Sequence, residues 1–103
     1  MARSRQDRLR AAEEARPAAV TGGSRRLDVR GMRVDELVRE VERFLDGLYT
    51  EGAADALFLH GHGTGALKEA LRAHLRASPY VASFRAGETH EGGDAVTLVA
   101  MKR

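Results

Sequence analysis

The sequence predicts a two-layer α/β domain, in which a four-stranded mixed sheet carries both helices on one face. Short apolar runs alternate with two segments of helical periodicity, in the order β-α-β-α-β-β. The strand–helix–strand units favour parallel pairing with right-handed crossovers. A short glycine-rich link, residues 91–94, joins the last two runs and favours an antiparallel final strand. We expect the other face of the sheet to stay open for a partner or another domain, with Phe58 and alternate residues of the last strand on it.

The first half of the chain contains the clearest periodic signal. Residues 27–29 form a short alternating run that ends at Gly31, and we interpret it as the first strand. The following helix has one apolar face, made of Val34, Leu37, Val38, Val41, Phe44, Leu45 and Leu48. Asp35 and Glu36 lie in its first turn, where the helix dipole favours acidic residues. Gly52 is placed to end it.

The second half repeats this arrangement. Residues 56–59 are a short apolar run and predict a buried strand. The next helix is predicted from an apolar repeat of Leu67, Ala70, Leu71 and Leu75. It should end before Ser78-Pro79, because the residue before a proline disfavours helical geometry. Residues 80–85 and 95–101 complete the set as the third and fourth strands.

Composition and charge limit the possible functions. The 103 residues suffice for one domain, and the absence of cysteine excludes disulfides, Cys-ligated zinc and thiol catalysis. No apolar run is long enough for a membrane span or a secretory signal, so we expect no membrane partner and a cytoplasmic location.

Residues 1–26 hold seven arginines against three acidic residues, whereas residues 27–103 hold ten basic and twelve acidic residues. We expect residues 1–24 to be a basic flexible arm or linker remnant, and residues 25–103 to be the folded domain. Charge alone leaves open a polyanion partner or a solubilising linker.

The segment from His60 to Lys68 follows a predicted strand and opens a predicted helix. Its glycines allow a ligand to approach the backbone closely, and the free N–H groups of the helix start favour an anion such as phosphate. The residues expected to contact phosphate or nucleic acid are Gly61, His62, Gly63, Thr64, Gly65, Lys68 and Arg72. The spacing fits neither a Walker A motif nor a dinucleotide fingerprint. The alternative is a tight turn without a ligand, but the two interleaved histidines favour the phosphate site.

Asp28 and His60 end the first two predicted strands. If these strands are parallel neighbours, about 4.8 Å apart, the two side chains can approach each other as a general acid/base pair. The alternative is that Asp28 caps the loop or pairs with Arg30, and that His62 is a solvated loop residue. His60 and His62 could share an ion with Asp28, but no further carboxylate has ligand-like spacing, so we expect no metal site.

Two other histidines carry less information. His74 falls on the polar side of the second helix and is expected to be exposed. His90 falls in the loop between the last two strands, where it either reaches a substrate or has no role.

Three motifs, in order, resemble those of the Smr (small MutS-related) domain family. Residues 27–31, Leu-Asp-Val-Arg-Gly, resemble the family's opening motif, and residues 60–65, His-Gly-His-Gly-Thr-Gly, resemble its second motif, followed by Leu-Lys. Residues 92–97 resemble its closing glycine-rich hairpin. The resemblance implies a fold like that of the C-terminal domain of bacterial translation initiation factor three. It also implies endonuclease activity on DNA or RNA. Arg30 matches the form of the first motif found in the bacterial MutS paralogue linked to recombination control and ribosome rescue.

The leading hypothesis is therefore an endonuclease domain that acts on structured or branched DNA. In it Asp28 assists His60, and Arg30 stabilises phosphate charge. No cofactor is required by the sequence, although Mg²⁺ or Mn²⁺ could assist. The rival hypotheses are a non-catalytic module that binds nucleic acid or the ribosome, an RNA endonuclease, and a docking or dimerisation domain that uses the open sheet face. We expect the isolated domain to be a monomer and to belong to a longer multidomain protein.

Overall fold

The computed structural model describes residues 25–102, and the predicted basic arm lies outside these described residues. Its strands are β1 (Arg25–Asp28), β2 (Asp55–Leu59), β3 (Val81–Ala86) and β4 (Val96–Met101). Its helices are α2 (Val34–Glu51) and α3 (Ala66–Ala77), with two short 3-10 turns, η1 (Thr89–Glu91) and η2 (Gly93–Ala95), between β3 and β4. The predicted order of elements is confirmed, with strand boundaries that differ by at most two residues.

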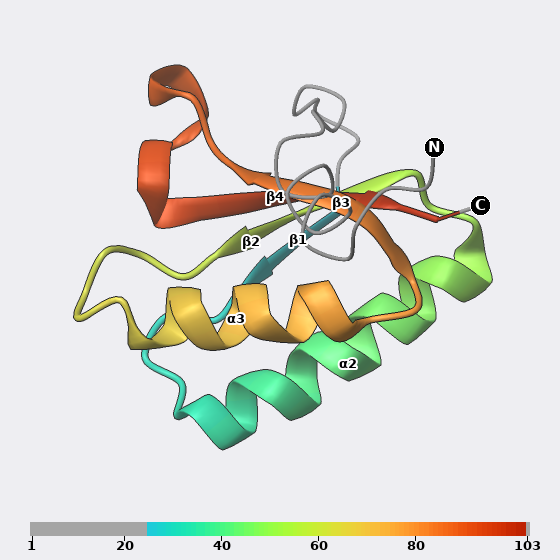
Figure 1. Ribbon diagram of the computed structural model, residues 1–103, viewed down its shortest axis with the longest axis horizontal. Coiled ribbons are helices and arrows are strands. Elements are labelled where there is room, and N and C mark those ends of the chain that lie inside the picture. The colour runs from blue at the N-terminus through green and yellow to red at the C-terminus, as the bar shows by residue number, and fades with distance from the viewer. Residues whose placement is uncertain (1–24, 103) are drawn as a thin grey trace, which may run out of the picture.

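The sheet has the order β1-β2-β4-β3. β1 and β2 are parallel, and β4 is antiparallel to both β2 and β3. Both helices cover the same face of the sheet, as Figure 1 shows, so the predicted mixed sheet with two helices on one face is confirmed. β4 lies between β2 and β3, so the two strands joined by α3 are not paired. The expectation of parallel pairing is thus confirmed for the first strand–helix–strand unit and was wrong for the second.

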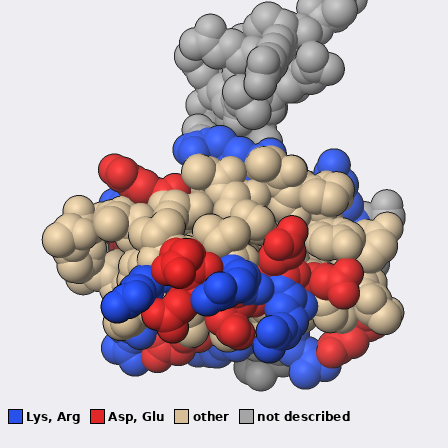
Figure 2. All heavy atoms as spheres, turned by 90° about the horizontal axis from the view of Figure 1, so that it is seen from below, with Lys and Arg blue, Asp and Glu red and all other residues tan. Residues whose placement is uncertain are grey.

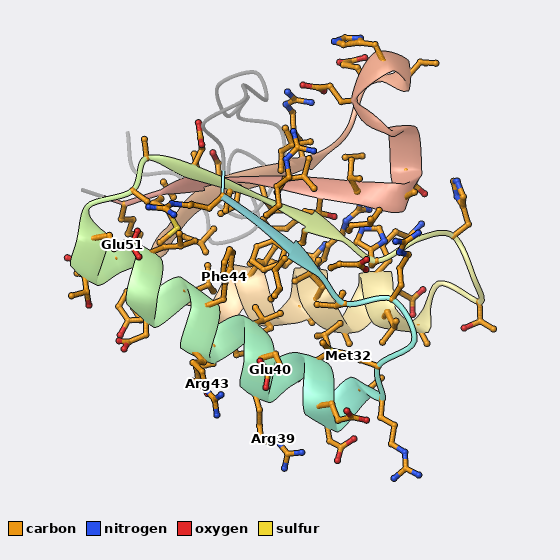
Figure 3. All side chains as sticks on the ribbon, turned by 180° about the vertical axis from the view of Figure 1, so that it is seen from behind. Met32, Arg39, Glu40, Arg43, Phe44 and Glu51 are labelled. Atoms are coloured by element: carbon orange, nitrogen blue, oxygen red, sulfur yellow. The ribbon has the colours of Figure 1, made fainter. Side chains whose placement is uncertain are left out.

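The main core lies between the helices and the sheet. The periodic face of α2 is buried through Leu37, Val41, Leu45 and Leu48. In Figure 3, Phe44 points from α2 toward the sheet, whereas Arg39 and Arg43 point away from it. The Phe44 ring meets the Phe58 ring of β2 edge-on, with centroids 5.5 Å apart. Such edge-to-face contact adds to the hydrophobic gain of burying both rings.

The expectation that Phe58 lies on the open face was wrong. Phe58 is 0% exposed and belongs to the core under the helices. A four-residue apolar run has no alternation from which its faces could be assigned. Leu57 instead points to the other face, where it forms a second buried cluster with Val96 and Leu98 of β4. The expectation that alternate β4 residues occupy that face is therefore confirmed.

Gly52 ends α2 with a left-handed backbone (φ 74°), as predicted. Its N–H donates to the carbonyl oxygens of Leu48 and Tyr49. Neither helix of the described part is long and apolar enough to cross a membrane.

Candidate functional site

The loop from β2 to α3 has an unusual backbone. Gly61, Gly63 and Gly65 have φ values of 75°, 44° and 87°, in the left-handed region that other residues rarely adopt. The N–H of Gly65 donates to the His62 carbonyl (3.2 Å), and the N–H of Ala66 donates to Thr64 Oγ1 (3.3 Å). The three glycines are thus needed to form the turn, whether or not a ligand binds there.

The same loop lines a hollow of about 200 Å³ at the start of α3. Its walls are formed by His60, His62, Gly63, Thr64, Gly65, Ala66, Leu67 and Lys68. The first N–H groups of a helix have no carbonyl one turn earlier to accept their hydrogen bonds, so they favour an anion in this position. A Cβ atom added at Gly63 or Gly65 would meet nothing within 4 Å, so the space in front of these residues is open to a ligand.

Asp28 and Arg30 lie beside this loop because β1 is the parallel neighbour of β2. The Asp28 carboxylate accepts hydrogen bonds from Arg30 Nε (3.0 and 3.2 Å), Arg30 Nη2 (2.8 Å) and the Arg30 backbone N–H (3.0 Å). These bonds lower the pKa of Asp28 to about 2. A carboxylate with so low a pKa remains ionised and is a weak general base. The structure gives Arg30 Nη1 no protein partner among the described residues, so its donors remain available to an anion.

The first and second motifs meet where Arg30 crosses Gly61. A Cβ on Gly61 would lie 3.5 Å from Cγ and Cδ of the Arg30 side chain. The aliphatic part of Arg30 therefore packs over the glycine loop, and its guanidinium group is held at the edge of the loop by Asp28.

His60 is buried, with 5% of its surface exposed, and faces β4. Its Nδ1 lies 2.9 Å from the Gly61 carbonyl oxygen, which can only accept, so Nδ1 carries the proton. Its Nε2 lies 2.9 Å from Thr97 Oγ1, and in the neutral ring it accepts from that hydroxyl. Burial is the largest cause that lowers the pKa of His60. The structure thus holds His60 neutral in a single tautomer.

The predicted Asp28–His60 pair is not formed. Asp28 is in register with Leu59, whose side chain packs with the cluster on the far face of the sheet. Since side chains alternate along a strand, the next residue, His60, points toward the helix face. The pairing of Asp28 with Arg30, the alternative weighed from sequence, is the one that the structure shows.

Thr97 connects His60 to the basic residues of α3. Thr97 is fully buried, and its Oγ1 accepts a hydrogen bond from Arg72 Nε (3.2 Å) while it donates to His60. Arg72 Nη2 also contacts Asp94 Oδ1 (3.2 Å), and Lys68 Nζ contacts Asp94 Oδ2 (2.6 Å). The hydrogen bonds from Lys68 and Arg72 lower the pKa of Asp94 below its ordinary value, and the bond from Lys68 is the largest cause.

Sequence reasoning missed Thr97 and Asp94 as members of the site. Both lie in the closing hairpin motif, where Asp94 was interpreted only as a turn residue. Their position in that motif was the available signal, but it did not show which side chains they would contact. Asp94 compensates part of the charge on Lys68 and Arg72, which leaves one net positive charge in this group of three.

The remaining candidate residues lie apart from this network. His62 is exposed at the rim of the hollow. His74 is half-buried beside Tyr80, rather than exposed as predicted, and His90 is exposed in η1. Within residues 25–102 there is no group of three or more His, Cys, Asp or Glu side chains that could hold a metal ion.

The burial of His60 predicts a pH dependence of stability. In the unfolded chain the imidazole has a pKa of about 6.5, and burial lowers the pKa in the folded chain. The unfolded chain therefore binds more protons in mild acid. The stabilisation is fully present above about pH 6.5 and is lost as the pH falls below that value. We expect the Tm to fall between about pH 7.5 and pH 5, and to fall less in His60→Gln.

The titration of Asp28 and Asp94 does not overlap with this measurement. The pKa values of Asp28 and Asp94 are lowered, so these groups take up protons at more acidic pH. A Tm that falls equally in wild type and His60→Gln over this range would contradict the assignment of the effect to His60.

Comparison with known proteins shows the family of this chain. The sequence profile of the Smr domain matches residues 27–102. The chain belongs to the Smr domain family. It is 69% identical to Endonuclease MutS2 of Anaeromyxobacter sp. (strain Fw109-5) over 103 residues, which are 100% of this chain and 13% of that protein. It is 47% identical to Endonuclease MutS2 of Caldanaerobacter subterraneus subsp. tengcongensis over 75 residues, 73% of this chain and 10% of that protein.

Two solved structures share the fold of this Smr domain. The crystal structure of the Smr domain of Thermus thermophilus MutS2 aligns with a TM-score of 0.75 and 39% identity, covering 77% of this chain and 99% of that one. YdaL, a stand-alone small MutS-related protein from Escherichia coli, aligns with a TM-score of 0.73 over 97% of this chain and 78% of that one. Its identity of 17% makes it a likeness of fold alone. The sequence-based assignment to the Smr family is confirmed.

Proposed function

We propose that this Smr domain is an endonuclease domain that binds structured or branched DNA and nicks it, with the scissile phosphate held at the glycine loop. One observation carries the proposal: the glycine loop lines a hollow that opens on the N-terminus of α3, and the Arg30 side chain, held by Asp28, packs against Gly61 of the same loop. The helix N-terminus and the open glycine backbone both favour a phosphate in this hollow, and the Arg30 guanidinium group adds a cation beside the same loop.

The residues of the site divide into those that contact the phosphate and those that position them. Backbone groups of residues 61–65, with Thr64, His62, Lys68 and Arg72, bind the phosphate. Arg30 stabilises the charge that develops as water adds to phosphorus and the ester P–O bond breaks. The water gives up one proton in this step, and the departing ester oxygen takes up a proton and leaves as a hydroxyl group. Asp28 positions Arg30, because its ionised carboxylate fixes the guanidinium group through two parallel bonds.

His60 acts as a second positioning residue in this proposal. Its Nδ1–H donates a hydrogen bond to the Gly61 carbonyl oxygen, and its Nε2 accepts one from the Thr97 hydroxyl, so His60 links the loop to β4. Because both ring nitrogens are engaged, His60 is not placed as the general base that the sequence suggested. Asp28 does not act as the general base either, because its lowered pKa makes its carboxylate a weak base.

A non-catalytic binding module is the second candidate function. The observation that favours it is that the titratable groups expected to perform proton transfer, Asp28 and His60, are each held by other partners. Such a module would bind nucleic acid or the ribosome at the same loop, without cleavage. An RNA endonuclease would bind a phosphate of RNA, in place of DNA, at the same loop.

A cleavage assay separates these functions. The whole chain is incubated with supercoiled plasmid, branched DNA and structured RNA, each with EDTA, Mg²⁺ or Mn²⁺. Nicking of plasmid or branched DNA supports the proposal, and cleavage confined to RNA favours the RNA endonuclease. Binding to all substrates without cleavage under any metal condition would favour the binding module.

The glycine loop predicts a specific binding defect. Gly63→Ala places a methyl group in the open space before the hollow and strains a backbone at φ 44°. We expect the affinity for branched DNA to fall about tenfold, which corresponds to about 1.4 kcal/mol. Fluorescence anisotropy with labelled DNA measures the effect.

Gly52→Ala is the matched control for this variant. Gly52 also has a left-handed backbone with no neighbour for a Cβ atom, but it lies at the end of α2, outside the site. Both variants should lose similar stability, about 1 to 2 kcal/mol from the left-handed backbone. If the two variants bind DNA with equal affinity, the glycine loop is a tight turn that holds no ligand.

A further inference from the structure

The two helices of this domain carry opposite net charges. α2 contains six acidic and two basic residues, a net charge of −4, whereas α3 contains three basic residues and one acidic residue, a net charge of +2. In Figure 2, acidic and basic side chains gather in a band on the helix side of the molecule. Asp94, which pairs with Lys68 and Arg72, reduces the net charge on the α3 side to +1. A polyanion is therefore attracted to the α3 side of this layer and repelled from the α2 side.

The basic residues of α3 form one line, which we name the basic stripe: Lys68, Arg72 and Arg76. Their spacing of four residues places them on one side of the helix, one above the other, with a rise of about 6 Å per step. Lys68 borders the hollow at the glycine loop, so the stripe begins at the candidate phosphate site and leads away from it. The side chains of Lys68 and Arg72 are 27% and 20% exposed, respectively.

A cleft continues the stripe at the edge of the sheet. This cleft of about 170 Å³ lies between α3 and the edge strand β3 and is lined by Arg72, Arg76, Phe84, Arg85 and Ala86. The guanidinium carbon of Arg76 lies 5.6 Å from the centroid of the Phe84 ring, which supports the long side chain over the cleft. Arg85 is anchored by Glu91 through two bonds (2.7 and 3.1 Å), and its Nε is a buried donor that has no hydrogen-bond partner among the described residues.

We infer that the basic stripe and this cleft bind the sugar–phosphate backbone of a polynucleotide next to the phosphate held at the glycine loop. This inference rests on the proposed function and extends it, because it names the surface that holds the phosphates next to the scissile one. Arg72 belongs to both regions, since it contacts Thr97 and Asp94 of the site and lines the cleft. The strand runs along α3 toward β3, because α2 presents a net negative surface on the other side.

The test is a charge reversal at Arg76, which lies outside the residues that hold the scissile phosphate. Arg76→Glu and the milder Arg76→Gln are compared with Arg39→Glu, which makes the same charge change on α2, where the side chain points away from the sheet (Figure 3). The affinity for a labelled branched DNA is measured over a series of salt concentrations. Each phosphate contact adds about 0.9 to the slope of log K against log salt.

We expect Arg76→Glu to weaken binding at least about tenfold and to reduce the slope by about 0.9, with a smaller loss of affinity for Arg76→Gln. Arg39→Glu should leave the slope unchanged. Thermal melting shows that the variants are folded. An unchanged slope in folded Arg76→Glu, or an equal loss in Arg39→Glu, would overturn the inference.

Failure of this inference is distinguishable from failure of the proposed function. If only the inference fails, Gly63→Ala still weakens binding while Arg76→Glu does not. If the glycine loop is not the phosphate site, Gly63→Ala binds like Gly52→Ala while Arg76→Glu still reduces the slope.

Discussion

Phe58→Ala should lower the free energy of unfolding by about 3 to 5 kcal/mol, the range found when a buried aromatic ring is removed from a core. Phe58 is 0% exposed and contacts the Phe44 ring of α2, so truncation leaves a cavity where α2 meets the sheet. A domain of this size has a total stability of about 5 to 15 kcal/mol, so the loss is a large part of the whole. Urea unfolding followed by circular dichroism measures it.

Tyr49→Ala is the control for this prediction. Tyr49 is also an aromatic residue, but 48% of its surface is exposed at the end of α2, where its ring packs against Tyr80. Its removal should cost clearly less than the removal of Phe58. Loss of less than about 1 kcal/mol in Phe58→Ala would place this ring on the surface, as the sequence had suggested.

Arg30→Ala is expected to slow DNA nicking by about 10² to 10³-fold, the effect of removing one group that stabilises charge in a transition state. The expectation rests on the proposed function and on the packing of the Arg30 side chain against Gly61, with its guanidinium group held by Asp28. Arg30→Lys should restore little activity, because an ammonium group cannot be held by Asp28 through two parallel bonds. The rate of conversion of supercoiled to nicked plasmid is the measurement.

Arg43→Ala serves as the matched control, since Arg43 is exposed on α2 and points away from the sheet (Figure 3). It should nick at the wild-type rate. Asp28→Asn should resemble Arg30→Ala, because the neutral amide no longer fixes the guanidinium group. If folded Arg30→Ala nicks plasmid as fast as wild type, Arg30 has no part in the chemistry.

Periodicity predicted most of the fold because it reports on the burial of long elements. The apolar face of α2 and the stop at Gly52 were both visible in the sequence, and both are found in the structure. The face of Phe58 was not predictable, because β2 is apolar at neighbouring positions and either side of such a strand can face the helices. Only the packing of α2 against the sheet decides it.

The site was predictable where it depends on local sequence and was not where it depends on strand register. The glycine loop and Arg30 come from contiguous motifs. The expected Asp28–His60 pair failed because side chains alternate along a strand: Asp28 shares the face of its partner Leu59, and His60 points to the other. Thr97 lies 37 residues from His60 in the chain, and the sequence does not show that their side chains lie within hydrogen-bond distance.

The strand order has a consequence for how this domain is made. β4 is the last strand along the chain, yet it occupies a central place in the sheet and pairs with both β2 and β3. Until Val96–Met101 has left the ribosome, β3 has no partner strand and β2 has only β1. These distant pairings also slow the closure of the sheet compared with a helical bundle of similar size. Thr97 arrives with β4, so the hydrogen bonds of His60 and Arg72 to Thr97 form only after this strand has left the ribosome.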